Sequence, residues 1–397
     1  MSNQYSRNVY VLSLYTALVG IGYAIFLTLF PIYLLSLGYS MEDLGAINTL
    51  ANLFVAFIIP FLGILADHYG RKPLVTLAGL AMATSLLILG YTKTYPLLIV
   101  AYTLMNFSFM AEQPARGAMT AESVTEKQMG GAFGLTITPF FIARAIVPSL
   151  SGLMADKLGF NLTFILGGIL TSIGVLFFFI LSVETLEKEK RKKTSWKKAI
   201  KALKPRKDLT WLYIATILDS FAWGMWFSLL NAYIYDIHGL SATDIGLLNT
   251  FMFSVTFLSQ YLAGRWIDKK GYLFGFVITE FLGVIATTLL GTTRHITFLF
   301  LSLLCIGLSI ALWIPSFNNA ISLNTKKEQR AREYSKINTY RSIISIPAPY
   351  IGGYIYDHIS PQTTFLTSTT LLILTTTFFY YKLKQEKPTH KQTIKLL

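Results

Sequence analysis

Charged residues are scarce in this 397-residue chain, and their scarcity is the first constraint on its class. Asp, Glu, Lys and Arg make up 14% of the residues, whereas a soluble globular domain carries about 25%. Hydrophobic residues make up 53%. A surface with so few charges is poorly suited to water, so lipid is the expected solvent for most of the chain.

Cysteine and histidine are too few and too scattered for a metal site or a disulfide framework. The single cysteine, Cys305, cannot form an internal disulfide, and no zinc-ligand spacing is present. The five histidines form no ligand set and no catalytic constellation. No phosphate-binding loop ending in Lys-Ser or Lys-Thr occurs, so direct ATP drive is not expected. The sequence predicts neither an enzyme nor a cofactor; a proton or other ion gradient is the expected driving force.

Acidic residues are also outnumbered, since 20 Asp and Glu stand against 34 Lys and Arg. The basic residues gather in the loop after residue 183, near residues 326–336 and in the C-terminal tail. The loops that alternate with these hold only Lys93, Lys157 and Arg294. Short loops rich in Lys and Arg stay in the cytoplasm, which places both termini there in an inner or plasma membrane. This distribution argues against a nucleic-acid partner.

Long apolar runs are abundant, and each is a candidate membrane-spanning helix because about 20 apolar residues cross a bilayer. The first run is too long for the apolar region of a signal peptide, so we expect it to be retained. Helices suit the lipid interior because their backbone hydrogen bonds are made within the helix, whereas an open sheet would leave backbone groups unpaired. The sequence predicts twelve spans, at residues 9–36, 43–66, 73–91, 95–117, 131–155, 161–183, 210–236, 244–267, 272–291, 296–320, 333–356 and 362–383.

An internal repeat relates the two halves of the chain. The stretch from Gly63 to Gly70, with Asp67 at its centre, returns 201 residues later from Gly264 to Gly271. The same ungapped shift relates five residues before it, Gly38, Ser40, Asp43, Gly45 and Asn48, to Gly239, Ser241, Asp244, Gly246 and Asn249. We therefore expect an N-terminal six-helix bundle at 1–183, a basic cytoplasmic linker at 184–209, and a C-terminal six-helix bundle with a short cytoplasmic tail at 210–397.

A second period lies within each half. The G-x-x-x-D element recurs 89 residues after Gly63, at Gly152, and 89 residues after Gly264, at Gly353. A repeated unit of three helices must be inverted in the membrane, because three is odd. Six-helix halves with nested inverted repeats are a transporter architecture. Within the linker, Trp196 to Leu203 is either a short helix on anionic lipid or a solvated basic segment.

The Gly63–Lys72 segment resembles the signature loop of the major facilitator superfamily, G-x-L-a-D-r-x-G-r-k, with His68 in place of the usual arginine. The repeats, the basic central loop and the number of predicted spans agree with that family. The resemblance implies a twelve-helix secondary transporter that works by alternating access. It also implies a cytoplasmic gating cluster, made of Gly63, Asp67, Gly70, Arg71, Arg116 and Asp268.

Drug:proton antiporters of this family often carry G-P-x-x-G-G in the fifth helix. Here the fifth helix reads Val147-Pro148-Ser-Leu-Ser151-Gly152, without the leading glycine, and the eleventh reads Ala348-Pro349-Tyr-Ile-Gly352-Gly353. The partial match leaves proton-coupled efflux open.

Charges deep in lipid cost about 2.5–3.5 kcal/mol on insertion scales and mark functional positions by default. Asp219 lies roughly 14 Å into the seventh predicted helix at 1.5 Å per residue, and Arg144 is similarly deep in the fifth. Arg144 could pair with Asp219 or bind an anionic substrate. Glu112 is expected to pair with Arg116, and Glu280, in the ninth helix, is either structural or functional.

Polar and aromatic residues accompany these charges. Asp219 shares a helical stripe with two tryptophans, an arrangement that suits a cationic or amphipathic ligand or, alternatively, helix packing. The expected substrate and proton-coupling residues are Asp219, Arg144, Trp223, Trp226, Tyr23, Asn106, Asn231 and Asn318.

Three functions agree with these features. Proton-coupled efflux of small drug-like or amphipathic compounds by a monomer in membrane lipid is the leading hypothesis. Import or facilitated movement of a sugar, an organic anion or another metabolite is the alternative. A transport-fold sensor is a remote third.

Overall fold

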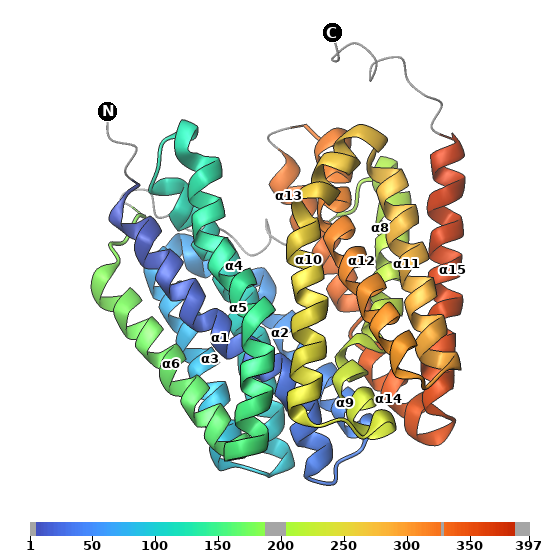
Figure 1. The fold of residues 1–397 in the computed structure, drawn as a ribbon. Coiled ribbons are helices and arrows are strands. Elements are labelled where there is room, and N and C mark those ends of the chain that lie inside the picture. Colours follow the sequence, from blue (N-terminus) through green and yellow to red (C-terminus); the bar gives the residue numbers. More distant parts are fainter. Residues whose placement is uncertain (1–4, 187–203, 327–328, 386–397) are drawn as a thin grey trace. The chain divides into compact units, whose positions relative to one another are not determined.

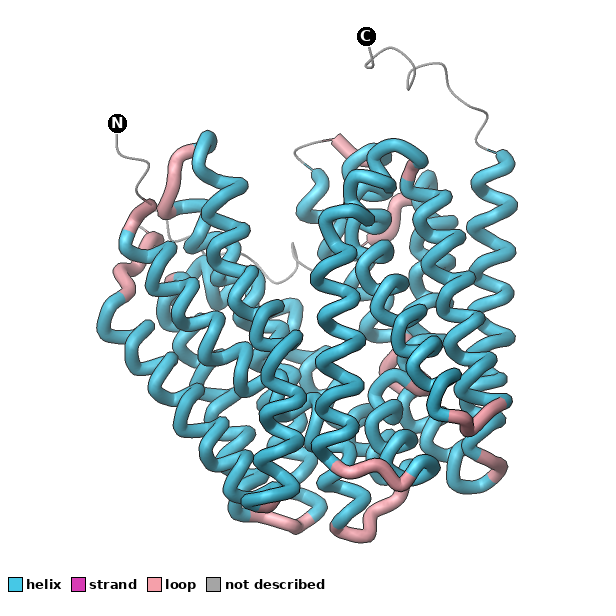
Figure 2. The backbone as a smooth tube through the Cα atoms, in the orientation of Figure 1, coloured by secondary structure: helices cyan, strands magenta, loops and turns pink. Residues whose placement is uncertain are grey.

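The computed structural model describes residues 5–186, 204–326 and 329–385, with all side chains except those of residues 59–61, 63–67 and 331. The described residues are helical almost throughout and contain no strand (Figure 2). The helices of the first half are α1 Arg7–Ser36, α2 Met41–Tyr69, α3 Arg71–Tyr91, α4 Tyr95–Glu122, α5 Met129–Leu158 and α6 Phe160–Leu181. Those of the second half are α8 Thr210–Gly224, α9 Leu230–His238, α10 Ala242–Lys270, α11 Tyr272–Thr292, α12 Ile296–Asn324, α13 Arg330–Ile344, α14 Ala348–His358 and α15 Pro361–Gln385.

Two of the predicted spans are each divided into two helices. The span predicted at 210–236 is interrupted between α8 and α9, where Gly224 ends α8 and a 3-10 turn, Phe227–Leu229, follows. The span predicted at 333–356 is interrupted between α13 and α14. Pro347 lies at this interruption and disfavours helical geometry in the residue before it. With each interrupted pair counted once, the described residues form twelve long helices, which confirms the predicted all-α fold.

Nine segments of the described chain are long and apolar enough to cross a membrane by length and composition. The predicted spans that miss this limit are α4, the α13–α14 pair and α15. Polar residues account for the low hydropathy of α4, which carries Asn106, Glu112 and Arg116. These polar positions are candidates for function, because polar and charged groups within a membrane are costly and are usually kept for a functional role.

The chain divides into two compact units, each of which is built from three stretches of sequence. One contains Met1–Lys204, Phe227–Ser254 and Ile346–Ile359, and the other contains Pro205–Trp226, Val255–Ser345 and Ser360–Leu397. Each interrupted helix passes from one unit to the other at its interruption. The predicted boundaries at 1–183, 184–209 and 210–397 stay a prediction. The surface helix expected at Trp196–Leu203 lies outside the described residues.

In the first unit, α1 packs along α5 and α6, and α3 packs along α4 and α6 (Figure 1). Aromatic side chains fill the space beside α1. Phe26 stacks on Phe30 with 4.9 Å between ring centroids, and the edge of Tyr102 meets both rings. The Tyr15 hydroxyl donates to the carbonyl of Val75 at 3.0 Å, so this buried polar atom is satisfied.

In the second unit, α11 packs against α12 and α15, and α8 packs against α13 and α15 (Figure 1). Phe276 on α11 and Phe379 on α15 are fully buried and stack with 4.5 Å between ring centroids. Leu212 on α8 belongs to the same buried cluster. This core holds α8, α11 and α13 in fixed relation, and these helices carry the buried charges described below.

The internal repeat is visible in the backbone. Gly70 and Gly271, which are 201 residues apart, have φ values of 113° and 92° and begin α3 and α11. These values favour glycine because a Cβ strains the backbone there. Helix starts repeat as well. The backbone N–H of Asp43 donates to the hydroxyl of Ser40 at 3.1 Å, and the backbone N–H of Asp244 donates to the hydroxyl of Ser241 at 3.2 Å.

Helices α5 and α10 cross so closely that only glycine fits at the contact. A Cβ on Gly152 would lie 2.1 Å from the carbonyl oxygen of Ala242. Four residues later, the carboxylate of Asp156 accepts hydrogen bonds from the backbone N–H groups of Ala242, at 3.2 Å, and Thr243, at 2.7 Å. The G-x-x-x-D element therefore provides a close approach and an N-terminal cap for the helix it crosses.

The repeat places the same arrangement between α14 and α2. A Cβ on Gly353 would lie 2.3 Å from the carbonyl oxygen of Met41. The carboxylate of Asp357 accepts a hydrogen bond from the backbone N–H of Glu42 at 2.7 Å. Two of the four G-x-x-x-D copies found in the sequence thus perform the same structural task.

We expect Gly152→Ala to destabilise the α5–α10 crossing, because its Cβ would overlap a backbone oxygen that cannot rotate away. Overpacking of this kind costs about 1–3 kcal/mol. Thermal unfolding of the purified protein in detergent measures the effect. Gly134→Ala is the control on the same helix, since a Cβ there meets nothing within 4 Å. Equal melting temperatures for the two variants would show that the close crossing contributes nothing to stability.

Candidate functional site

An ion pair is buried among the helices of the second unit. Asp219, on α8, is 2% exposed, and its Oδ2 accepts a hydrogen bond from Nη2 of Arg341, on α13, at 3.0 Å. Arg341 also donates from Nε to the carbonyl of Thr216 at 3.1 Å. Breaking a pair of this kind would leave a buried charge without a partner or water, so the pair holds α8 and α13 together.

Aromatic rings complete the surroundings of this pair. The Arg341 guanidinium lies 4.2 Å from the centroid of the Trp313 ring and 5.4 Å from that of Phe317. A cavity of about 180 Å³ adjoins the pair, lined by Asp219, Ser220, Trp223, Ser309, Ile310, Trp313, Ile314 and Arg341. We name this cavity the acidic pocket. A carboxylate and two indoles around one cavity can hold an organic cation.

A second polar cavity, of about 280 Å³, lies within the first unit. Arg144 on α5 is the only charged residue in its lining, and its guanidinium lies 4.1 Å from the ring centroid of Phe253 on α10. No carboxylate of the described chain forms an ion pair with Arg144. We name this cavity the arginine pocket. A cation without a counter-ion in a polar cavity is suited to an anionic group.

Asn231 on α9 lines the arginine pocket, and it is held there by a backbone carbonyl that Pro31 leaves free on α1. Pro31 has no backbone N–H, so the carbonyl of Leu27, four residues earlier, loses its helical partner. The side chain of Asn231 donates to that carbonyl at 3.2 Å and to the carbonyl of Thr28 at 3.3 Å. Asn249 in turn donates to Asn231 Oδ1 at 2.8 Å.

A chain of hydrogen-bonded asparagine side chains forms another part of the lining of the arginine pocket. Asn106 donates to Asn52 Oδ1 at 2.9 Å, Asn52 donates to Asn48 at 2.7 Å, and Asn48 donates to the Tyr102 hydroxyl at 2.7 Å. Because each amide orients the next, the polar groups that face the cavity are held in place before a ligand arrives.

The structure places the predicted substrate residues in two groups and leaves three aside. Asp219 and Trp223 line the acidic pocket, and Arg144, Asn106 and Asn231 line the arginine pocket. The others line neither cavity: Tyr23 is buried against Phe109 and Phe140, Trp226 is buried against Trp223 and Phe365, and Asn318 is exposed on α12. The expected tryptophan stripe assumed an unbroken helix, but α8 ends before Trp226.

The basic partner of Asp219 was missed in the sequence, and the role of a third charged residue, Glu280, was left open. Arg341 lies in the polar first half of the span predicted at 333–356, so it did not stand out as a charge within an apolar run. Glu280 on α11 is fully buried, and its carboxyl group faces that of Asp219. Its depth in the ninth predicted helix was the one signal that the sequence offered.

Part of the gating cluster can be described. The carboxylate of Glu184 accepts hydrogen bonds from the backbone N–H groups of Arg71 and Lys72, both at 3.0 Å, at the N-terminus of α3. The Arg71 side chain also contacts Glu122, with 3.2 Å between Nη2 and Oε1. Gly70 fits beside Glu184, because a Cβ would lie 2.2 Å from its Oε2.

The remaining gating residues are held in separate local contacts. Arg116 pairs with Glu112 at 2.7 Å, as the i,i+4 spacing predicted, and Asp268 accepts a hydrogen bond from Asn319 at 3.0 Å. The side chains of Gly63 and Asp67 lie outside those described. The gating role of the cluster stays a prediction.

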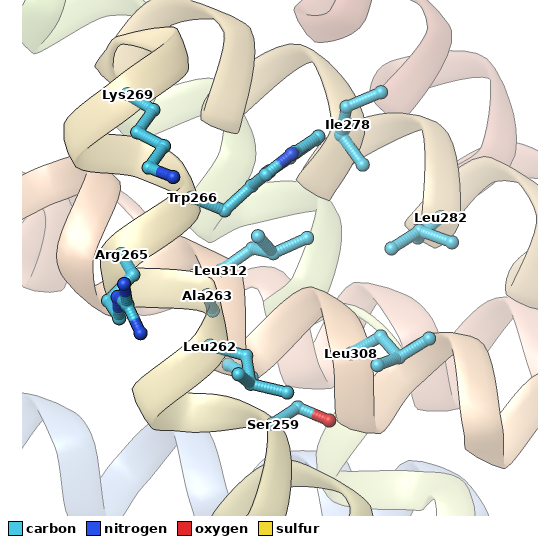
Figure 3. Close-up of a pocket in the computed structure, with 11 residues that line it drawn as sticks. Ser259, Leu262, Ala263, Arg265, Trp266, Lys269, Ile278, Leu282, Leu308 and Leu312 are labelled. Carbon is cyan, nitrogen blue, oxygen red and sulfur yellow. The ribbon is translucent and has the colours of Figure 1, made fainter.

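A third cavity, of about 740 Å³, is mostly apolar and contains none of the predicted substrate residues. Leu262 and Trp266 of α10 line it on one side, and Ile278 and Leu282 of α11 lie across from them (Figure 3). The basic side chain of Lys269 lies near Trp266 in the same view. An apolar groove with basic residues beside it is suited to a lipid tail and its headgroup.

Comparison with known proteins gives relatives that span the chain. The sequence is 22% identical over 366 residues to the multidrug resistance protein MdtG of Proteus mirabilis, covering 89% of this chain and 90% of that one. The MdtG of Salmonella typhi is also 22% identical, over 88% of this chain and 89% of its own.

Solved structures share the fold. The nucleoside transporter NupG superposes with a TM-score of 0.75 at 16% identity, over 96% of this chain and all of its own. The human organic anion transporter MFSD10 superposes with a TM-score of 0.69 at 17% identity, over 94% of this chain and 99% of its own. The sequence profile of the Major Facilitator Superfamily matches residues 12–349 and 212–396. This multi-pass membrane protein is thus a secondary transporter of small molecules rather than an enzyme, and it belongs to the Major Facilitator Superfamily.

Proposed function

We propose that the chain exports small cationic or amphipathic organic compounds in exchange for protons, without a bound cofactor. The observation that carries this proposal is the buried Asp219–Arg341 pair beside the indoles of Trp223 and Trp313. A carboxylate in this setting can attract an organic cation by charge and by cation–π contact. The multidrug resistance relatives support the same substrate class.

Transport of ethidium, an aromatic monovalent cation, tests the proposal. Proteoliposomes with an acidic interior should accumulate ethidium when they contain the protein, because protons leaving the vesicle drive the cation inward. Protein-free liposomes and proteoliposomes without a pH gradient are the controls. Accumulation that is equal with and without the gradient would rule out proton-coupled exchange of this compound.

Transport of an organic anion is the second candidate function. Arg144 in the arginine pocket favours it, because this residue has no acidic partner among the described side chains. A guanidinium binds carboxylates through a planar, two-pronged arrangement that other side chains cannot copy. Proteoliposomes should then move radiolabelled benzoate, and Arg144→Gln should abolish that movement. Benzoate flux equal to that of protein-free liposomes would exclude this candidate for benzoate.

We propose that both termini and the central linker lie in the cytoplasm of an inner or plasma membrane, and that a monomer in lipid is the working unit. The excess of Lys and Arg in the linker and tail supports this orientation. We also propose that the gating cluster around Asp67 and Arg71 holds the cytoplasmic side closed during part of the cycle. The capping of α3 by Glu184 supports this proposal by fixing the position of Arg71.

Cysteine labelling tests the orientation, and the single native cysteine makes the background simple. In a Cys305→Ala background, Arg294→Cys should react with an impermeant maleimide in intact cells, and Lys326→Cys should react only in everted vesicles. Both positions are exposed. The reverse pattern would overturn the proposed orientation.

A further inference from the structure

Glu280 is a buried acid to which no described residue donates a hydrogen bond. It is fully buried on α11, and neither of its carboxyl oxygens accepts a hydrogen bond from the part of the chain that the structure describes. An ionised carboxylate without a donor is unstable in such a place, because nothing replaces the water it has lost. The side chain is therefore compatible with its surroundings only when it carries a proton or binds a cation.

The neighbouring helices bring one acceptor and one cation to Glu280. Its carboxyl group faces that of Asp219 on α8, and Asp219 Oδ1 accepts no hydrogen bond from the described residues. The close approach of α11 to α8 is seen one turn later, where a Cβ on Gly283 would lie 3.2 Å from Trp223. The Arg341 guanidinium on α13 pairs with the other oxygen of Asp219.

Asp219, Glu280 and Arg341 form a cluster that we name the carboxyl cluster. Among the described residues, the one further titratable group that acts on it is Tyr334 of α13, beside Arg341. The helices that pack most extensively against α11 are α12 and α15. The only titratable residue of α12 is Cys305, and α15 has none before Tyr380. Two carboxyl groups therefore share one guanidinium, and one proton on either carboxyl makes the cluster neutral.

We propose that Glu280 and Asp219 share one exchangeable proton, held between Glu280 and Oδ1 of Asp219, and that a monovalent organic cation in the acidic pocket takes its place. The proton links one oxygen of Glu280 to Oδ1 of Asp219 in one hydrogen bond, and it removes the negative charge from the Glu280 carboxyl group. When it leaves to solvent, the carboxyl cluster carries a net charge of minus one, and the positive charge of the ligand restores neutrality. One proton is thus exchanged for one positive charge, and no other co-reactant is needed.

The proton site itself is independent of the proposed efflux function; only its exchange with a cation rests on that function. Infrared spectroscopy of the reconstituted protein tests the site without transport. Wild type at pH 7 should show the C=O stretch of a protonated carboxyl, and Glu280→Gln should lose it, because Asp219 then pairs with Arg341 as a carboxylate. Glu126→Gln, at an exposed position in the loop between α4 and α5, is the control and should retain the band.

Asp219→Asn is the second variant. With Asp219 neutral, Glu280 becomes the counter-ion of Arg341, so this variant should lose the same band. Absence of the band in wild type, or its persistence in Glu280→Gln, would overturn the assignment. Size-exclusion chromatography shows whether each variant is folded.

Ethidium binding tests the exchange. If one proton leaves for each cation bound, wild-type affinity should rise about tenfold per pH unit over the range in which the cluster is protonated, by linkage. Glu280→Gln should bind with an affinity that does not depend on pH. Equal pH dependence in both proteins would overturn the exchange. If wild type keeps the infrared band but binds no ethidium at any pH, the proton site stands and the proposed cation efflux fails.

Discussion

Asp219→Asn should abolish the accumulation of ethidium against its gradient while the protein still folds. The substitution removes the carboxylate that pairs with Arg341 and, in our proposal, shares the proton with Glu280. Folding should survive because Glu280 can become the counter-ion of Arg341, so no buried cation is left alone. Without an exchangeable proton, the pH gradient no longer drives the cycle. Accumulation in proteoliposomes should fall to the protein-free level, and downhill exchange of ethidium should remain.

Asp208→Asn is the matched control for this substitution. Asp208 lies just before the same helix, is paired with Arg206, and is exposed. It should accumulate ethidium as wild type does. Full gradient-driven accumulation by Asp219→Asn would show that Asp219 is a structural residue.

Arg341→Gln should be among the most destabilising single changes in the second unit. It leaves two buried carboxyl groups without a cation, and breaking a buried pair costs about 3–5 kcal/mol. The loss of contact with the Trp313 ring adds about 0.5–1 kcal/mol. The loss should grow as pH rises, because carboxyls that ionise then have no cation beside them. Thermal unfolding in detergent at pH 6 and pH 8 measures both effects.

A double variant separates the missing charge from the missing side chain. Asp219→Asn combined with Arg341→Gln leaves one carboxyl, which can stay protonated, so much of the stability should return. Arg294→Gln changes an exposed arginine in the loop before α12 and is the control. If the double variant is no more stable than Arg341→Gln, the charge balance of the carboxyl cluster does not govern stability here.

The sequence predicted the helices well because their main signals are local. Apolar runs, turn glycines and a 201-residue repeat depend on residues near in the chain or on direct self-comparison. The repeat also contained a signal that was not interpreted: the four G-x-x-x-D copies indicated a shared role, and Asp156 and Asp357 prove to cap the helices that they cross.

The composition of the carboxyl cluster could not be read from the sequence, because its members come from three helices. Asp219 was noticed for its depth, but its partner was sought in Arg144, the one other deep arginine in a clearly apolar segment. Arg341 lies in α13, whose sequence is polar although one face of the helix is buried. Glu280 was visible, yet only its position opposite Asp219 distinguishes it from a structural acid.

The interruptions of α8–α9 and α13–α14 were missed for a different reason. Hydropathy averages over a window of residues and does not register a local change in the backbone. Pro347 and Gly224 were available as helix-ending residues. A proline in a membrane helix, however, often leaves the helix intact, so the residue types alone did not decide.

The most direct test of coupled exchange is to drive protons with a cation gradient. Proteoliposomes that contain the pH indicator pyranine, with equal pH on both sides, are given an inward ethidium gradient. The account predicts that the interior becomes more alkaline, with one proton leaving for each ethidium that enters, and that Glu280→Gln shows no such change. Ethidium entry through the wild-type protein without any change in internal pH would contradict the account.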